Sequence, residues 1–194
     1  MDSSCILVED NVVPESLRKE ILDWVVSNEN LDIFNTSTTD ASTDRKAFAV
    51  TYTKDNLPTI LRYFSAPKTN IYNFIAIVTR TSGDIPTHTD DDLTCIMYGL
   101  DINPIYVKLP HTTSVHYMDI CDQMTGGDTI FECIDKEVII PAMQNTMVTF
   151  PSSIPHAVTA INSSTKPRVV MVCEKYYILP TGYKKIVTGK YRSG

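Results

Sequence analysis

A histidine and an aspartate two residues apart, His88 and Asp90, are the first side chains here whose types and spacing could do chemistry. They belong to the segment Asp84–Leu100 and lie just after one apolar run and just before another. In an extended segment, residues i and i+2 point to the same face, so the imidazole and the carboxylate would stand side by side. Two histidines and one carboxylate on one face of the metal form the facial site of non-haem iron(II). The pair would supply two of these three ligands.

A second histidine and an arginine occupy similar positions further along the chain. His156 follows an apolar run, Thr146–Phe150, and a turn rich in proline and serine, so it is expected at the rim of a sheet. Arg168 opens another apolar run, where a guanidinium is costly to bury without an anion. Its planar fork fits a carboxylate. The set His88, Asp90, His156 and Arg168 is therefore a candidate site for a metal and an anion.

Each member of this set also has a simpler interpretation. His-x-Asp alone is a frequent chance pattern, and His88 with Asp90 could be a surface pair near a turn. His156 could be a hydrogen-bonded histidine at the rim, and Arg168 could pair with Glu174 or another acid. We expect the remaining histidines to be structural or exposed, and the acids that follow Asp90 to be solvated or to lie behind the ligands. These are His111, His116, Asp91 and Asp92.

Short apolar runs separated by turn residues predict the elements that must position this set. Two helices are expected near the N-terminus, over residues 14–26 and 57–64, and short strands over 5–8 and 47–52. From residue 71 on, strands follow one another without helices, which indicates a β-sandwich or barrel. These runs are 71–80, 93–100, 105–109, 115–118, 129–133, 137–140, 146–150, 157–161 and 168–179.

Composition narrows the class of protein. The 194 residues suffice for one domain with a core, and the formal net charge of −6 makes a nucleic-acid partner unlikely on charge. The five cysteines have no zinc-site spacing and indicate buried thiols in a reducing compartment. Neither a signal peptide nor a run of membrane-spanning length is visible, so we expect a cytoplasmic protein.

In these residues and their order, the sequence resembles the iron(II)/2-oxoglutarate-dependent dioxygenases, and within them the prolyl 4-hydroxylase-like branch. The resemblance covers about residues 70–179. Three blocks carry it: His88-Thr-Asp90 followed by Leu93–Tyr98; Gly126–Phe131, with its glycine pair; and Asn145–Phe150 followed by His156 and Arg168.

The resemblance implies a role for each matched residue. His88, Asp90 and His156 match the iron ligands of the family, and Arg168 and Tyr98 match residues that bind the far carboxylate of 2-oxoglutarate. From the residue alone, Tyr98 could equally be a core tyrosine with a hydrogen-bonded hydroxyl. The implied fold is a double-stranded β-helix, or jelly roll, with N-terminal helices packed on one sheet. We expect a single domain over residues 1–194, with helical support in 1–70, a jelly-roll core in 71–180 and a basic tail in 181–194.

The implied activity is hydroxylation with release of succinate and CO2. Its cofactors would be Fe(II), 2-oxoglutarate and O2, and ascorbate is a possible addition. The substrate would be a peptidyl residue such as proline. A small molecule or free amino acid, a non-catalytic jelly-roll binding module and a cupin-type metalloprotein without 2-oxoglutarate are the alternatives. The oligomeric state stays open.

Overall fold

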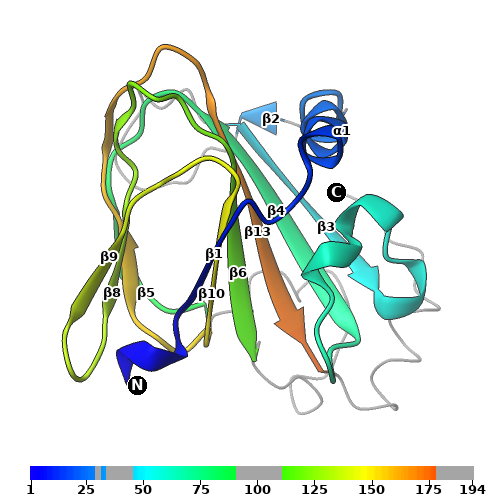
Figure 1. The fold of residues 1–194 in the computed structure, drawn as a ribbon, viewed down its shortest axis with the longest axis horizontal. Coiled ribbons are helices and arrows are strands. Elements are labelled where there is room, and N and C mark those ends of the chain that lie inside the picture. Colours follow the sequence, from blue (N-terminus) through cyan, green and yellow to red (C-terminus); the bar gives the residue numbers. More distant parts are fainter. Residues whose placement is uncertain (29–31, 34–45, 91–110, 178–194) are drawn as a thin grey trace.

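Antiparallel strands make up most of the structure, a computed structural model that describes residues 1–28, 32–33, 46–90 and 111–177. Tyr98, the tail 181–194 and the strands expected over 93–100 and 105–109 lie outside the described residues. The described strands form two main sheets that face each other, with α1 against the outer side of the larger one (Figure 1). This is the predicted jelly roll, a mainly β fold with flanking helices.

The larger sheet has seven strands in the order β1-β10-β6-β13-β4-β3-β2, and all neighbours are antiparallel. Two of its central strands, β4 and β13, are nine residues long and mostly buried, as their largely apolar sequences predict. The bounds are β1 Leu7–Asp10, β2 Asp32–Ile33, β3 Lys46–Thr53, β4 Ile71–Thr79, β6 Thr112–Asp119, β10 Thr146–Phe150 and β13 Arg168–Tyr176.

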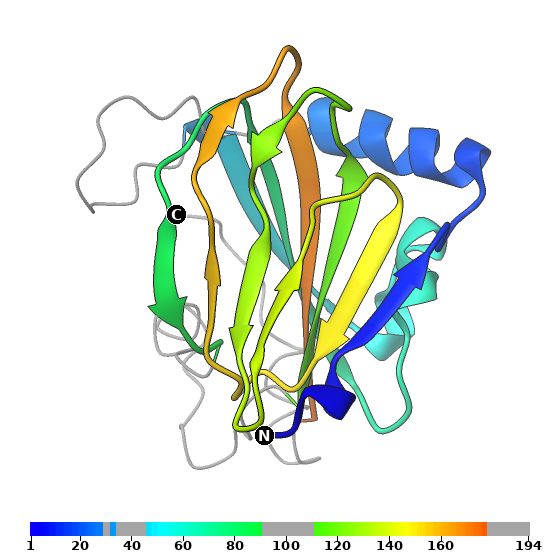
Figure 2. The ribbon, with the colours of Figure 1, turned by 60° about the vertical axis from the view of Figure 1, so that its left-hand side comes forward.

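The smaller sheet has four strands in the order β5-β11-β8-β9. Strands β12 and β7 pair only with each other and form a separate two-stranded sheet. Figure 2 shows the smaller sheet from its own side, with the larger sheet behind it. From β4 on, the chain crosses repeatedly between the two sheets, so residues far apart in sequence meet between them. The bounds are β5 Ile85–His88, β7 Thr125–Gly126, β8 Thr129–Glu132, β9 Glu137–Ile140, β11 His156–Val158 and β12 Ile161–Ser163.

Two hydrophobic clusters lie on opposite faces of the larger sheet. Successive residues of a strand point to opposite faces, so Met171 and Cys173 of β13 face outward and Val170 faces inward. The outer cluster packs against α1 (Glu15–Val26) through Ile21 and Val25, and against the 3-10 helix η3 (Thr59–Phe64). The inner cluster fills part of the space between the sheets, with Phe131 and Phe150 among its members, which leaves the rest of that space for a site.

The N-terminal helix begins where its sequence predicts. Pro14 is the residue before Glu15, and Glu15 forms an ion pair with Arg18 one turn on. Arg18 is buried and donates to the carbonyl of Met118. The remaining 3-10 helices are η1 (Ser3–Cys5) and η2 (Lys54–Asn56).

The N-terminal part of the chain also completes the larger sheet. Strands β1, β2 and β3 all come from residues 1–70, so this segment supplies sheet edges as well as helical support. The boundary expected at residue 70 therefore does not separate the sheet from its support. The expectation of one domain over residues 1–194 stays a prediction.

Several element boundaries differ from those expected. The first strand begins at Leu7, because Cys5 belongs to η1, and the second expected helix is the 3-10 helix η3. The single run expected over 157–161 is divided into β11, which pairs with β5 and β8, and β12, which pairs with β7. This division arises because the two halves of the run have different partners, and local sequence does not specify partners.

Candidate metal and anion site

The two histidines of the predicted set are register partners across two strands. His88 is the last residue of β5 and His156 is the first of β11, and their Cα atoms pair. Asp90 lies just past the end of β5, and its backbone N–H donates to Ser152 O in the turn before His156. The sequence placed Asp90 on an extended segment, whereas the strand ends two residues earlier. The three side chains nevertheless converge.

Backbone carbonyls orient both imidazoles. Nδ1 of His88 lies 2.9 Å from Pro86 O, and Nδ1 of His156 lies 3.0 Å from Ile154 O. A carbonyl oxygen only accepts hydrogen bonds, so each Nδ1 must carry the proton. In the neutral form of such a ring, Nε2 keeps the lone pair that binds a metal.

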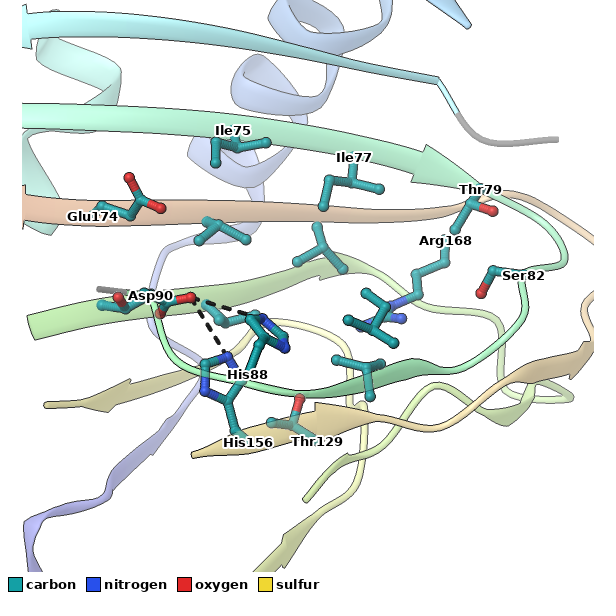
Figure 3. Close-up of a pocket in the computed structure, with 16 residues that line it drawn as sticks. Ile75, Ile77, Thr79, Ser82, His88, Asp90, Thr129, His156, Arg168 and Glu174 are labelled. Carbon is teal, nitrogen blue, oxygen red and sulfur yellow. Dashed lines mark ion pairs between the residues drawn. The ribbon is translucent and has the colours of Figure 1, made fainter. Parts of the chain in front are cut away.

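The ligand atoms lie at distances that one ion can bridge. Asp90 Oδ1 is 3.6 Å from His156 Nε2 and 3.9 Å from His88 Nε2, and one ligand atom from each residue lies within 4.8 Å of the others (Figure 3). Ligands bound at about 2.1 Å and at right angles are about 3 Å apart. Small side-chain rotations would close that difference.

The environment of the three side chains also fits a cation. Asp90 Oδ2 is buried and has no hydrogen-bond partner among the described residues, which is costly for a carboxylate oxygen. Burial lowers the pKa of His156, although the negative charge of Asp90 opposes this shift. The imidazole is therefore held neutral, as metal binding requires. Two imidazoles and one carboxylate are the donor set of a facial iron(II) site.

These side chains line one cavity of about 200 Å3 between the two sheets. Seven branched apolar side chains form part of its walls, and its polar groups include the three candidate ligands, Arg168 and Glu174 (Figure 3). A small apolar cavity with a few convergent polar groups is typical of a ligand site. The apolar walls are Ile75, Ile77, Ile85, Val115, Val158, Val170 and Val172.

Arg168 enters this cavity from the first position of β13, opposite Thr79 of β4. It is buried, and its guanidinium carbon lies 5.3 Å from the centre of the Tyr117 ring. The neighbouring Gly127 has a positive φ, and a Cβ there would come within 3.1 Å of Arg168 Nη1. The glycine therefore makes room for the guanidinium.

The expected alternative partner of Arg168 has other partners. Oε2 of Glu174 accepts hydrogen bonds from Asn73 Nδ2 at 2.9 Å and from the Tyr176 hydroxyl at 2.6 Å. No ion pair joins Arg168 to Glu174 within the part of the chain that the structure describes. Sequence reasoning did not recognise Glu174 as a cavity residue. The signal was present, because Arg168 and Glu174 are an even number of residues apart on one strand.

The other histidines lie away from the cavity. His116 is fully buried on the outer face of the larger sheet, where Tyr63 OH lies 2.9 Å from Nδ1 and Asn145 Oδ1 lies 3.2 Å from Nε2. His111 is exposed. Both match the expectation of structural or exposed histidines.

Comparison with known proteins shows the fold. By sequence, the chain matches no family model and no curated protein. By structure, it is similar to a prolyl-4-hydroxylase from Pseudomonas putida, with a TM-score of 0.59 and 11% identity, covering 90% of this chain and 93% of that one.

Two further solved structures give the same result. One is a Trichoplax adhaerens prolyl hydroxylase in complex with a hypoxia inducible factor peptide fragment (TM-score 0.57, 13% identity, 97% and 89% coverage). The other is SnoK, an alpha-ketoglutarate-dependent carbocyclase from nogalamycin biosynthesis (TM-score 0.59, 13% identity, 89% and 79% coverage). The chain has the jelly-roll fold of the 2-oxoglutarate- and iron(II)-dependent oxygenases, with prolyl hydroxylases among its structural neighbours.

Within the described residues, no helix has both the length and the apolar character needed to cross a membrane.

Proposed function

We propose that this protein is an Fe(II)- and 2-oxoglutarate-dependent dioxygenase that hydroxylates its substrate and releases succinate and CO2. One observation carries the proposal. His88, Asp90 and His156 converge in the same cavity between the two sheets that Arg168 enters from a different strand. A metal ligand set and a buried guanidinium in one apolar cavity are what a small, metal-chelating dicarboxylate requires.

The proposal gives each side chain a part in binding. His88, Asp90 and His156 would hold the metal on one face, with both imidazoles oriented by backbone carbonyls. Arg168 would bind the far carboxylate of 2-oxoglutarate, so that the chelating end is oriented by position. Bound iron(II) supplies the activation of O2, coupled to decarboxylation of 2-oxoglutarate. The branched apolar walls exclude water from this chemistry.

Tyr98 completes the cosubstrate site in this proposal. It lies outside the described residues, and its match to the family tyrosine that binds the same carboxylate supports its role. We propose it as the second partner of that carboxylate.

For the substrate, we propose a peptidyl residue such as proline. The Trichoplax adhaerens neighbour, a prolyl hydroxylase in complex with a peptide fragment, supports this class. A small molecule is the second candidate, supported by the equally similar SnoK from nogalamycin biosynthesis. Specificity depends on loops that a shared fold does not determine.

Turnover of 2-oxoglutarate tests the proposed reaction. The protein is purified without oxygen and loaded with Fe(II) and 2-oxoglutarate. It is then exposed to O2 with ascorbate, with and without a pool of proline-containing peptides, and succinate is measured by mass spectrometry. We expect succinate from the wild-type protein and from His111→Ala, whose histidine is exposed and outside the cavity. We expect none above background from His156→Ala. Equal succinate from His156→Ala and the wild type would contradict the proposal.

A further inference from the structure

A second buried acid, Glu174, lines the cavity on the side of the candidate ligands away from Arg168 (Figure 3). Arg168, Val170, Val172 and Glu174 alternate along β13 and all line the cavity. Arg168 and Glu174 are six residues apart on this extended strand, which separates their Cα atoms by about 20 Å. The two side chains therefore mark opposite ends of the cavity, with the candidate ligands between them.

Hydrogen bonds hold the Glu174 carboxylate in place through one oxygen only. Oε2 accepts from Asn73 Nδ2 and from Tyr176 OH, and Asn73 Oδ1 in turn accepts from Thr51 Oγ1 at 3.0 Å. Oε1 accepts no hydrogen bond from the described residues, and none of their cationic groups is within ion-pair distance. The carboxylate is thus fixed in position while one of its oxygens has capacity for a further donor.

Burial at this position disfavours the charged form of the Glu174 carboxyl group. Glu174 is only 7% exposed, and burial raises its pKa, with the negative charge of Asp90 adding to the shift. Tyr176 and Asn73 oppose the shift through their hydrogen bonds. Because the described residues supply no counter-ion, a carboxylate at this position would be stabilised by a cation that enters the same cavity. The cavity therefore has an end suited to an anion, at Arg168, and an end suited to a cation, at Glu174.

We propose that Glu174 binds an ammonium or guanidinium group of the substrate and so determines which substrates reach the metal. This inference rests on the proposed function, because the cosubstrate then occupies the Arg168 end and leaves the Glu174 end to the substrate. Such a cation could belong to a lysine or arginine within a peptide, or to a free amino acid. Both sources offer the same donor groups to Oε1.

Equilibrium binding of matched probes tests the role of Glu174 without turnover. The protein is loaded with Mn(II) and 2-oxoglutarate under nitrogen, and its affinity is measured by calorimetry for two pairs of peptides. One pair has a central lysine or the uncharged norleucine, and the other has a central arginine or the uncharged citrulline. Free lysine and free norleucine form a third pair, which distinguishes the two sources of the cation. The proteins compared are the wild type, Glu174→Gln and, as a matched control, Glu137→Gln, whose side chain is exposed on β9.

We expect the wild type and Glu137→Gln to prefer the charged member of at least one pair by about tenfold or more, and Glu174→Gln to lose that preference. Glutamine keeps the shape and an acceptor for Asn73 and Tyr176, so a lost preference reports the charge. A ratio of affinities for the charged and uncharged members near one in the wild type would overturn the inference while leaving the proposed function in place. A preference for the charged member that persists in Glu174→Gln would do the same. Absence of metal-dependent 2-oxoglutarate binding in the wild type would overturn both.

Discussion

His88 and His156 lie side by side across β5 and β11, with their ring centroids 4.4 Å apart, although they are far apart in the sequence. Two imidazole rings gain little from contact with each other. A shared cation, as proposed above, would account for their proximity and for the position of Asp90 Oδ1 close to both Nε2 atoms.

Removal of a candidate ligand should abolish metal binding. We expect His88→Ala and Asp90→Ala each to weaken the binding of Fe(II) or Mn(II) by about a hundredfold or more, because each removes one of three protein ligands. His88 is partly exposed, so its removal should leave the fold intact. Calorimetry under nitrogen measures the affinity, and circular dichroism checks the fold. His111→Ala is the control, and metal affinity in His88→Ala equal to that of the control would refute the assignment.

Removal of the buried guanidinium should weaken the cosubstrate rather than the metal. We expect Arg168→Gln to raise the dissociation constant of 2-oxoglutarate by about a hundredfold, since a charge-assisted bidentate bond is lost in a desolvated site. Its affinity for Mn(II) should change little. Arg62→Gln, at an exposed position in η3, should bind 2-oxoglutarate as the wild type does. Titrations with 2-oxoglutarate at saturating Mn(II) separate the two effects, and an unchanged dissociation constant in Arg168→Gln would count against the proposed role.

The turn that leads into β8 should not tolerate a side chain at Gly126. This glycine has a φ of +81°, and a Cβ there would meet the carbonyl oxygen of Ala160 at 1.8 Å. We expect Gly126→Ala to lower the free energy of unfolding by about 2 kcal/mol or more, from backbone strain and displacement of β12. Denaturant titration measures the change. Gln123→Ala, at an exposed position just before this turn, should stay close to the wild type. A similarly small effect of Gly126→Ala would mean that the turn relaxes.

Acid should destabilise the fold through His116. Burial lowers the pKa of this histidine to about 4, against a hydrogen bond to Asn145 that raises it. The unfolded chain, with an ordinary histidine pKa near 6.5, therefore takes up the proton first as the pH falls. The stability is full above pH 6.5 and is lost as the pH falls from there towards 4, by about 3 kcal/mol from this group.

Comparison of two variants isolates this contribution. His116→Gln keeps an acceptor for Tyr63 and a donor for Asn145 but cannot take up a proton in this range, so its free energy of unfolding should depend less steeply on pH between 6.5 and 4. His111→Gln should keep the wild-type slope, because His111 is exposed. Equal slopes for His116→Gln and the wild type would show that the buried histidine is not the titrating group.

Local sequence predicted the strands of this fold better than their partners. The apolar runs of β4, β10 and β13 are strong signals, because buried central strands are rich in apolar residues. The short strand β5 was not recognised, since Pro86 and the polar residues around it resemble a turn. The division of 157–161 into β11 and β12 depends on partners far away in the sequence.

For the candidate site too, the sequence predicted some features and not others. The chemical types of His88, Asp90, His156 and Arg168 and their positions at strand boundaries allowed the set to be predicted, and the structure brings all four to one cavity. Asn73 beside Glu174 could not be predicted, because their contact depends on the register of β4 against β13. The carbonyls that orient the imidazoles are local, since each belongs to the residue two positions before its histidine, but the sequence pattern does not specify the side-chain rotamers that bring them together. Tyr98 stays a prediction from the sequence.

The most direct test of the account is the visible absorption of the protein with Fe(II) and 2-oxoglutarate under nitrogen. A 2-oxo acid chelated to iron(II) gives a metal-to-ligand charge-transfer band that neither component gives alone. We predict that this band appears only when both are present, and that it is absent in His156→Ala and retained in His111→Ala. No band in the wild type at saturating concentrations of both, or an undiminished band in His156→Ala, would contradict the central claim.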